Sequence, residues 1–332
     1  MGNFSSCIYK GSSRYLRLSS SKSSKLHDIV TSTNFKWIDK EDYKIPTYLF
    51  TNVNAKVFII YCHANGEVLD DQLITLYKYT WERFGIPTNA ILFEYPGYGL
   101  MKGEATTKGC YTCLCDVVDY IMSINDKHLP IILHGRSIGA AFASRYASEN
   151  DIIDGIILET PFSSIHSIFS GCCISLRCCC PDILCSEYLH LIKVPKLMIY
   201  GTKDPLNPQK SQDELLEYFD TEDHVLRLAN FSHNNIPFGS KKSKLLCCIP
   251  HTCCCMVIPP VSGQQKKYFE IFKEYITSII SMTLTDYIDT TVNTDIVITS
   301  IIVPDCGQNK VSESLVNQEM IPQVQNDEYI EE

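Results

Sequence analysis

The stretch that decides the fold is PIILHGRSIGAAF, residues 130–142. Its apolar start predicts a buried strand, and the small residues after Gly139 predict a closely packed helix. Between them, Ser137 stands in a Gly-x-Ser-x-Gly pattern with Gly135 and Gly139. This pattern is typical of a sharp strand-to-helix turn that exposes a nucleophilic serine. An ordinary turn serine has the same spacing, so the surrounding sequence must decide between the two interpretations.

Apolar β-branched runs alternate with helical patterns along the rest of the chain. We expect strands at 56–62, 89–95, 130–135, 154–160, 193–201 and 223–230, and helices at 70–84, 106–124, 139–149, 209–219 and 265–280. Strands that are apolar on both faces and alternate with helices indicate an α/β fold with a mostly parallel sheet, covered by helices on both faces. Such a sheet places its functional site at the C-terminal ends of its strands.

Two further residues suited to catalysis directly follow predicted strands. Asp204 follows the strand at 193–201, and His233 follows the strand at 223–230. The chain order Ser, Asp, His is the order of α/β-hydrolases. His233 would act as general base on Ser137, and Asp204 would orient the imidazole. Taken alone, His233 could be a solvated or core histidine and Asp204 an ordinary turn residue. The placement of both residues directly after strands, together with Ser137, favours a catalytic role.

The loop CHANGE, residues 62–67, follows the first predicted strand and is expected to complete the site. A developing oxyanion needs fixed hydrogen-bond donors. The backbone N–H of Ile138, directly after the serine, is one expected donor. The backbone N–H of Asn65 is the other, because the small side chain of Ala64 allows this loop to approach closely.

Six blocks of the sequence carry a resemblance to a known group of proteins. They are FIIYCHANGE (58–67), AILFEYPGYG (90–99), ILHGRSIGAAFASRYA (132–147), GIILETPFSSI (155–165), VPKLMIYGTKDPLNP (194–208) and FSHNNI (231–236). In order and spacing they resemble the α/β-hydrolase domain-containing protein 17 group, over roughly residues 40–280. The resemblance implies a serine hydrolase of α/β-hydrolase fold with a short cap, and some members remove palmitoyl groups from cysteines of membrane-bound proteins. It implies that Ser137, Asp204 and His233 form the triad.

The same resemblance implies that Asn65 and Ile138 supply the oxyanion hole, and that residues 94–99 form a structural turn. The chain departs from the group at three places. Ala64 and Ser232 stand where the group usually has glycine, and a cysteine-rich insertion at 237–262 precedes the last predicted helix. The insertion puts the substrate range most in doubt.

Charge and composition divide the chain into three parts. Residues 1–27 form a basic, serine-rich arm, residues 28–283 the hydrolase domain with its cap at 161–192, and residues 284–332 a tail with ten acidic residues and one basic residue. No apolar run approaches the roughly 18 residues needed to span a bilayer, and no secretory signal is evident. There is no basic helix or zinc-finger spacing, so we expect no nucleic-acid partner, and we expect no metal or cofactor.

The first residues, MGNFSSC, fit a lipid anchor. Met1-Gly2 with Ser6 matches the N-myristoylation pattern, and Cys7 is a nearby palmitoylation candidate. A single myristoyl chain binds membranes weakly, so Cys7 or the basic arm would supply the second signal. The alternative is a short polar tail with a chance Met-Gly. We expect a peripheral protein on the cytoplasmic face of the plasma membrane or of endomembranes.

The seventeen cysteines cluster rather than spread. An odd number in a chain expected to be intracellular argues against a disulfide framework. The clusters within 172–185 and 247–255 have two open interpretations: they dip into the membrane near the site, or they pack as small buried hydrophobes. The cap would hold the acyl chain, with Phe162, Ile165 and Phe169 as expected lining residues.

We therefore expect a membrane-anchored serine hydrolase that cleaves acyl thioesters through an acyl-enzyme, most plausibly removing palmitate from S-acylated proteins. A carboxylesterase acting on lipids or small esters is an alternative, because the same triad cleaves oxygen esters. A non-catalytic, membrane-tethered scaffold is a second alternative. The partners of the hydrolase would be its substrates, S-acylated membrane proteins or acyl-ester lipids, in the cytoplasmic leaflet.

Overall fold

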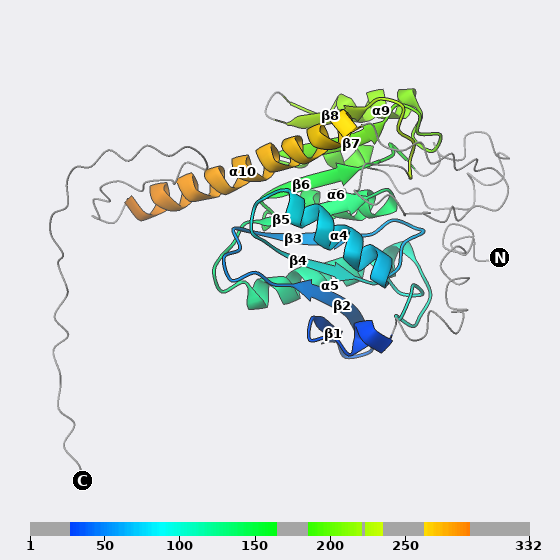
Figure 1. Cartoon of the computed structure of the whole chain (residues 1–332), viewed down its shortest axis with the longest axis vertical. Helices are drawn as coiled ribbons and strands as arrows, with labels where there is room; N and C mark the ends of the chain where they lie inside the picture. Colours follow the sequence, from blue (N-terminus) through cyan, green and yellow to red (C-terminus); the bar gives the residue numbers. More distant parts are fainter. Residues whose placement is uncertain (1–26, 165–184, 221–222, 235–261, 293–332) are drawn as a thin grey trace, which may run out of the picture. The chain divides into compact units, whose positions relative to one another are not determined.

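The predicted strands lie side by side in one eight-stranded sheet in the computed structural model (Figure 1). The structure describes residues 27–164, 185–220, 223–234 and 262–292. The strands are β1 (Phe35–Asp39), β2 (Lys44–Phe50), β3 (Val57–Cys62), β4 (Thr88–Phe93), β5 (Ile131–Arg136), β6 (Gly155–Glu159), β7 (Lys196–Gly201) and β8 (His224–Leu228). Their order across the sheet is β1-β2-β4-β3-β5-β6-β7-β8.

Six of the strands, from β4 to β8 across the sheet, run parallel to one another, and β2 pairs antiparallel with both β1 and β4. The two antiparallel strands were not expected from the sequence. Because β1 lies at the edge of the sheet, only two of its five residues are buried and it forms no continuous apolar run. Pro46 interrupts the apolar pattern of β2, so the sequence pattern does not predict that strand either.

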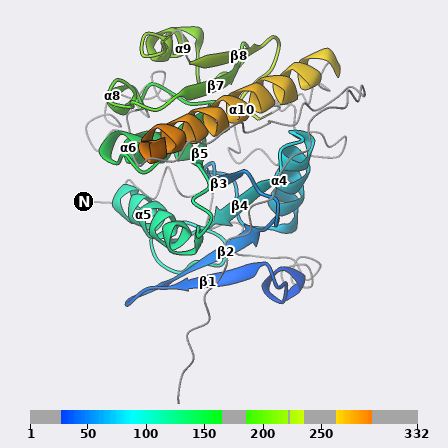
Figure 2. The same cartoon turned by 90° about the vertical axis from the view of Figure 1, so that its left-hand side faces the viewer.

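Helices cover both faces of the sheet, as predicted. They are α4 (Asp71–Arg83), α5 (Thr107–Ile124), α6 (Ile138–Glu149), α8 (Ser186–Leu189), α9 (Gln209–Leu216) and α10 (Ser262–Val292). Side chains of α5, α6, α8 and α9 pack in one apolar cluster with the sheet, and side chains of α4 and α10 pack in another on the opposite face. Figure 2 shows α5 and α6 on one side of the strands and α4 on the other. The predicted fold class is confirmed.

The last helix is longer than the sequence pattern predicts at both ends. We expected it at 265–280, but α10 extends from Ser262 to Val292. The boundary placed at 284 for the acidic tail therefore lies inside a helix, whose last buried residue among the described side chains is Ile279. No helix in the described ranges is both long enough and apolar enough to cross a membrane.

The parallel arrangement decides where a site can form. The interior strands β3, β5, β6 and β7 are buried along their whole length. Their C-terminal ends lie along the same edge of the sheet, and the segments that follow them meet there. The middle of the predicted cap, 165–184, and all but the last residue of the predicted insertion, 237–261, lie outside the described residues.

Candidate active site

Ser137 lies in the sharp turn between β5 and α6 with a backbone φ of +52°. A positive φ is costly for any residue other than glycine, and it occurs where surrounding structure enforces it. The two flanking glycines make the turn possible. A Cβ on Gly135 would lie 2.5 Å from the Cα of Ala140, and a Cβ on Gly139 would overlap the carbonyl oxygen of Cys62. The strand-to-helix turn predicted from the sequence is therefore present.

The structure brings the three predicted triad residues together. The Nε2 atom of His233 lies 3.0 Å from Oγ of Ser137, and its Nδ1 atom lies 2.7 Å from Oδ2 of Asp204. All three side chains are buried or nearly so, and Ser137 retains 9% exposure. With the proton on Nδ1, Nε2 is free to accept the serine proton. The arrangement can therefore deprotonate Ser137 for attack on a carbonyl carbon.

Asp204 is oriented by the backbone that follows it. Its Oδ1 atom accepts hydrogen bonds from the backbone N–H of Leu206 at 2.9 Å and of Asn207 at 3.0 Å. The other carboxylate oxygen is then directed at His233. These bonds fix the carboxylate in the orientation that lets Oδ2 accept from Nδ1 of His233.

The CHANGE loop packs against the serine turn, as its small residues predicted. The carbonyl oxygens of Cys62 and His63 face Gly139, which leaves no room for a larger residue there. The side chain of Asn65 accepts a hydrogen bond from Tyr98 at 2.6 Å, which ties the loop to the turn after β4. The backbone N–H of Ile138 is the first of α6, where unpaired amides face outward from a helix start. The use of the backbone N–H groups of Ile138 and Asn65 as oxyanion donors remains a prediction.

A buried group of charges beneath the triad was not expected from the sequence. Arg136 is 2% exposed and bonds to Glu67 through Nη1. Its Nε atom lies 2.9 Å from Oε1 of Glu159, and its Nη2 donates to the carbonyl oxygen of His233 at 3.3 Å. Burial disfavours the charged guanidinium, but Glu67 and Glu159 outweigh it and raise the pKa of Arg136 well above its ordinary value. The sequence shows a charged residue at the C-terminal end of two apolar strands, Arg136 in β5 and Glu159 in β6, but it does not show that they pair.

Two other buried titratable groups flank the site without touching the triad. Burial lowers the pKa of His63 to about 4, so its ring is neutral at pH 7. Burial raises the pKa of Glu94 to about 8, although its carboxylate accepts a hydrogen bond from the backbone N–H of Leu69. Glu94 thereby joins the segment after the CHANGE loop to the turn at 94–99. This agrees with the structural role expected for that turn.

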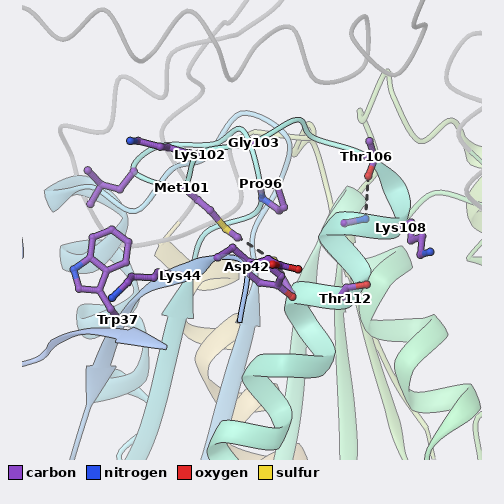
Figure 3. Close-up of a pocket in the computed structure, with 14 residues that line it drawn as sticks. Trp37, Asp42, Lys44, Pro96, Met101, Lys102, Gly103, Thr106, Lys108 and Thr112 are labelled. Carbon is purple, nitrogen blue, oxygen red and sulfur yellow. Dashed lines mark hydrogen bonds between the residues drawn. The ribbon is translucent and has the colours of Figure 1, made fainter. Parts of the chain in front are cut away.

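A pocket of about 760 Å³ opens at the β1–β2 turn, between that turn, the segment after β4 and the start of α5 (Figure 3). Its apolar walls include Trp37, Pro96 and Met101, and Lys102 and Lys108 stand at its rim. The lining residues do not include Ser137, Asp204, His233 or Asn65. This pocket is therefore separate from the triad.

The remaining predicted site residues are only partly described. Phe162 is 1% exposed and belongs to the core cluster that includes side chains of α5 and α6, and its acyl-binding role stays a prediction. Ile165 and Phe169, together with Gly2 and Cys7, lie outside the described residues. Within the described ranges, no group of His, Cys, Asp or Glu side chains could hold a metal ion.

The described cysteines behave as packing residues. They are all free thiols: Cys62, Cys110, Cys113, Cys115 and Cys185. Burial raises the pKa of Cys113 and of Cys185 to about 12, so neither is a thiolate at pH 7. For Cys185, the last residue of the cap cluster, packing is the interpretation that fits. The other members of the clusters at 172–185 and 247–255 lie outside the described residues.

Comparisons with known proteins find similar sequences and similar folds. No family model matches the chain. An α/β-hydrolase domain-containing protein of Caenorhabditis elegans, aho-3, is 25% identical over 185 residues, which cover 55% of this chain and 54% of that protein. An uncharacterised membrane protein of Saccharomyces cerevisiae is 27% identical over 190 residues, which cover 54% of this chain and 65% of that protein. The matches thus span between about half and two thirds of these relatives' lengths.

Among solved structures, the chain is similar to an esterase of Pyrococcus furiosus. The TM-score is 0.54 at 16% sequence identity, and the match covers 76% of this chain and 93% of the esterase. At this identity the likeness concerns the fold. Together with the parallel sheet and the serine turn, it shows that the chain has the α/β-hydrolase fold, and the curated relatives include a protein named as an α/β-hydrolase domain-containing protein.

Proposed function

We propose that the chain is a membrane-anchored serine hydrolase that removes palmitate from S-acylated proteins. The observation that carries the hydrolase part is the position of His233, which lies within hydrogen-bond distance of both Ser137 and Asp204. The thioester and membrane parts rest on the sequence. They are supported by the block-by-block resemblance over residues 40–280 and by the MGNFSSC start.

In the proposed reaction, His233 takes the hydroxyl proton of Ser137 while Oγ attacks the thioester carbonyl carbon. The negative charge that develops on the carbonyl oxygen is stabilised by the backbone N–H groups of Ile138 and Asn65. The carbon–sulfur bond then breaks, and protonated His233 gives its proton to the departing cysteine sulfur. An acyl-enzyme on Ser137 remains.

The second half of the reaction releases the acyl chain. His233 takes a proton from a water molecule, whose oxygen attacks the acyl carbonyl carbon. The bond to Ser137 Oγ breaks, and His233 returns the proton to the serine. The products are the free fatty acid and the free cysteine thiol. Throughout the cycle Asp204 orients His233 and stabilises the imidazolium that forms on it.

Two measurements test this function. A fluorophosphonate probe should label the wild type and fail to label Ser137→Ala, whereas an unlabelled wild type of native fold would favour the scaffold alternative. Hydrolysis of an S-palmitoyl peptide should then be compared with hydrolysis of a monoacylglycerol and of a short aryl ester. Much faster turnover of the glycerolipid would favour the carboxylesterase alternative.

The anchor is tested by mass spectrometry of the mature N-terminus, where an unmodified Gly2 would contradict it.

A further inference from the structure

The buried guanidinium of Arg136 contacts three separate segments around the proposed triad. Its partners are Glu67 in the CHANGE loop, Glu159 at the end of β6 and the backbone carbonyl of His233. The backbone N–H of Ser137, the next residue, donates to the carbonyl oxygen of Glu159 at 2.9 Å. The serine turn, the histidine turn and the expected oxyanion loop are thus joined through one side chain.

Glu67 connects this group to the oxyanion loop. Its Oε1 atom faces Arg136, and its Oε2 atom accepts hydrogen bonds from the backbone N–H of Ala64 at 2.8 Å and from the hydroxyl of Tyr61 at 2.7 Å. Burial would raise the pKa of Glu67, but Arg136 and the hydrogen bonds from Ala64 and Tyr61 together outweigh it, and the pKa lies below its ordinary value. Both carboxylate oxygens therefore act as acceptors, one toward the arginine and one toward the residue before Asn65.

We propose that Arg136 and Glu67 act together as positioning residues, which hold the Ala64–Asn65 backbone in register with Ser137. This inference rests on the proposed hydrolase function, for which that backbone supplies the oxyanion donor. Neither side chain bonds to Ser137 Oγ or to the His233 ring in this structure. They act through the His63–Ala64 peptide, which is adjacent to the peptide that carries the donor, and a shift of about 1 Å in such a group lowers rates strongly.

The charges of the group suggest a variant that leaves the fold intact. Two carboxylates face one guanidinium, so Glu67→Gln leaves the pair Arg136–Glu159 rather than an isolated charge. A glutamine cannot replace both acceptor oxygens, because one end of its amide is a donor. If its oxygen faces Arg136, its NH2 group meets the N–H of Ala64, and in the other orientation it meets the guanidinium. The hydrogen bond to the loop or the one to the arginine is lost.

Glu159→Gln is the matched control. Glu159 is buried in the same group and loses the same charge, but its carboxylate pairs with Arg136 and His134 and has no bond to the oxyanion loop. Both variants should be titrated with a fluorophosphonate to count reactive sites. They should then be assayed on a short aryl ester.

For Glu67→Gln we expect kcat per labelled site to fall by about 10- to 100-fold with KM changed by less than about threefold. Glu159→Gln should keep kcat per site within about threefold of the wild type. An equal fall in both variants, or no fall in Glu67→Gln, would overturn the proposal. If Glu67→Gln does not fold, Glu67→Asp keeps the charge and shortens the reach, and the same fall is expected.

Amide hydrogen exchange tests the positioning without any catalytic readout. The Ala64 amide should exchange at least about tenfold faster in Glu67→Gln than in the wild type, and at an unchanged rate in Glu159→Gln. An unchanged Ala64 rate in both variants contradicts the positioning role even if the enzyme is active. An inactive wild type with the expected exchange pattern would instead contradict the hydrolase function and leave the positioning role supported.

Discussion

The carbonyl oxygen of Cys62 occupies the space that a side chain on Gly139 would need. Cys62 ends β3, and Gly139 lies in the first turn of α6. The helix that begins after the serine is therefore in direct contact with the backbone that leads into the CHANGE loop. This contact sets the distance between the two expected oxyanion donors, and it depends on the absence of one Cβ atom.

Gly139→Ala should destabilise the protein and impair the site together. The new Cβ would overlap the Cys62 carbonyl and lie 2.8 Å from that of His63, so backbone must move. We expect the free energy of unfolding to fall by about 3 kcal/mol in urea titrations. Gly263→Ala is the control, because a Cβ there meets nothing within 4 Å. An unfolding curve for Gly139→Ala that coincides with that of the control would contradict the close contact.

Replacement of Ser137 should separate catalysis from backbone strain. Ser137→Ala and Ser137→Gly both remove Oγ, so both should lose fluorophosphonate labelling. At a φ of +52° alanine retains the steric cost and glycine does not. We expect Ser137→Gly to unfold at higher urea than Ser137→Ala, with a difference of about 1 kcal/mol. Equal stability of the two variants would mean that the turn relaxes when Oγ is absent.

Asp204→Asn should preserve the turn and lower the rate. The asparagine oxygen can accept the hydrogen bonds from Leu206 and Asn207, but its NH2 group then faces His233 and favours the wrong tautomer. We expect kcat to fall by about 10³- to 10⁴-fold, as in other Ser-His-Asp triads, with the melting temperature nearly unchanged. A loss of less than tenfold would show that Asp204 is not the residue that orients His233.

Glu94 should make stability depend on pH above neutrality. Burial raises its pKa from 4.5 to about 8, so the folded chain binds the proton more tightly than the unfolded chain. The free energy of unfolding contributed by this group falls as pH rises from about 4.5 to about 8, by up to about 1 kcal/mol per pH unit. Glu94→Gln should remove that slope in urea titrations between pH 6.5 and 8.5.

The pH range of this measurement avoids a second buried group. The pKa of His63 is lowered to about 4, so its folded form stays neutral and its contribution is lost only as pH falls below 6.5. Above pH 6.5 the difference between wild type and Glu94→Gln therefore reports Glu94. Parallel stability curves for the two proteins would show that Glu94 is already ionised at pH 6.5.

The local sequence predicted the interior of the fold well and its margins poorly. Strands such as β3 and β5 are buried on both faces, so their apolar runs are continuous and visible. The edge pair β1 and β2 is partly exposed and carries no such run. The end of α10 was missed because the helix continues beyond Ile280, the last of its described side chains that packs on the sheet.

The sequence by itself determined the chain order of Ser137, Asp204 and His233, each after a buried strand, and this order predicted the triad. Tertiary structure decided what surrounds it. Arg136, Glu67 and Glu159 are far apart in the chain and carry no shared motif, yet parallel strands bring their ends to one edge of the sheet. A buried charge must find its partner in space rather than in sequence, so only the assembled sheet reveals the group.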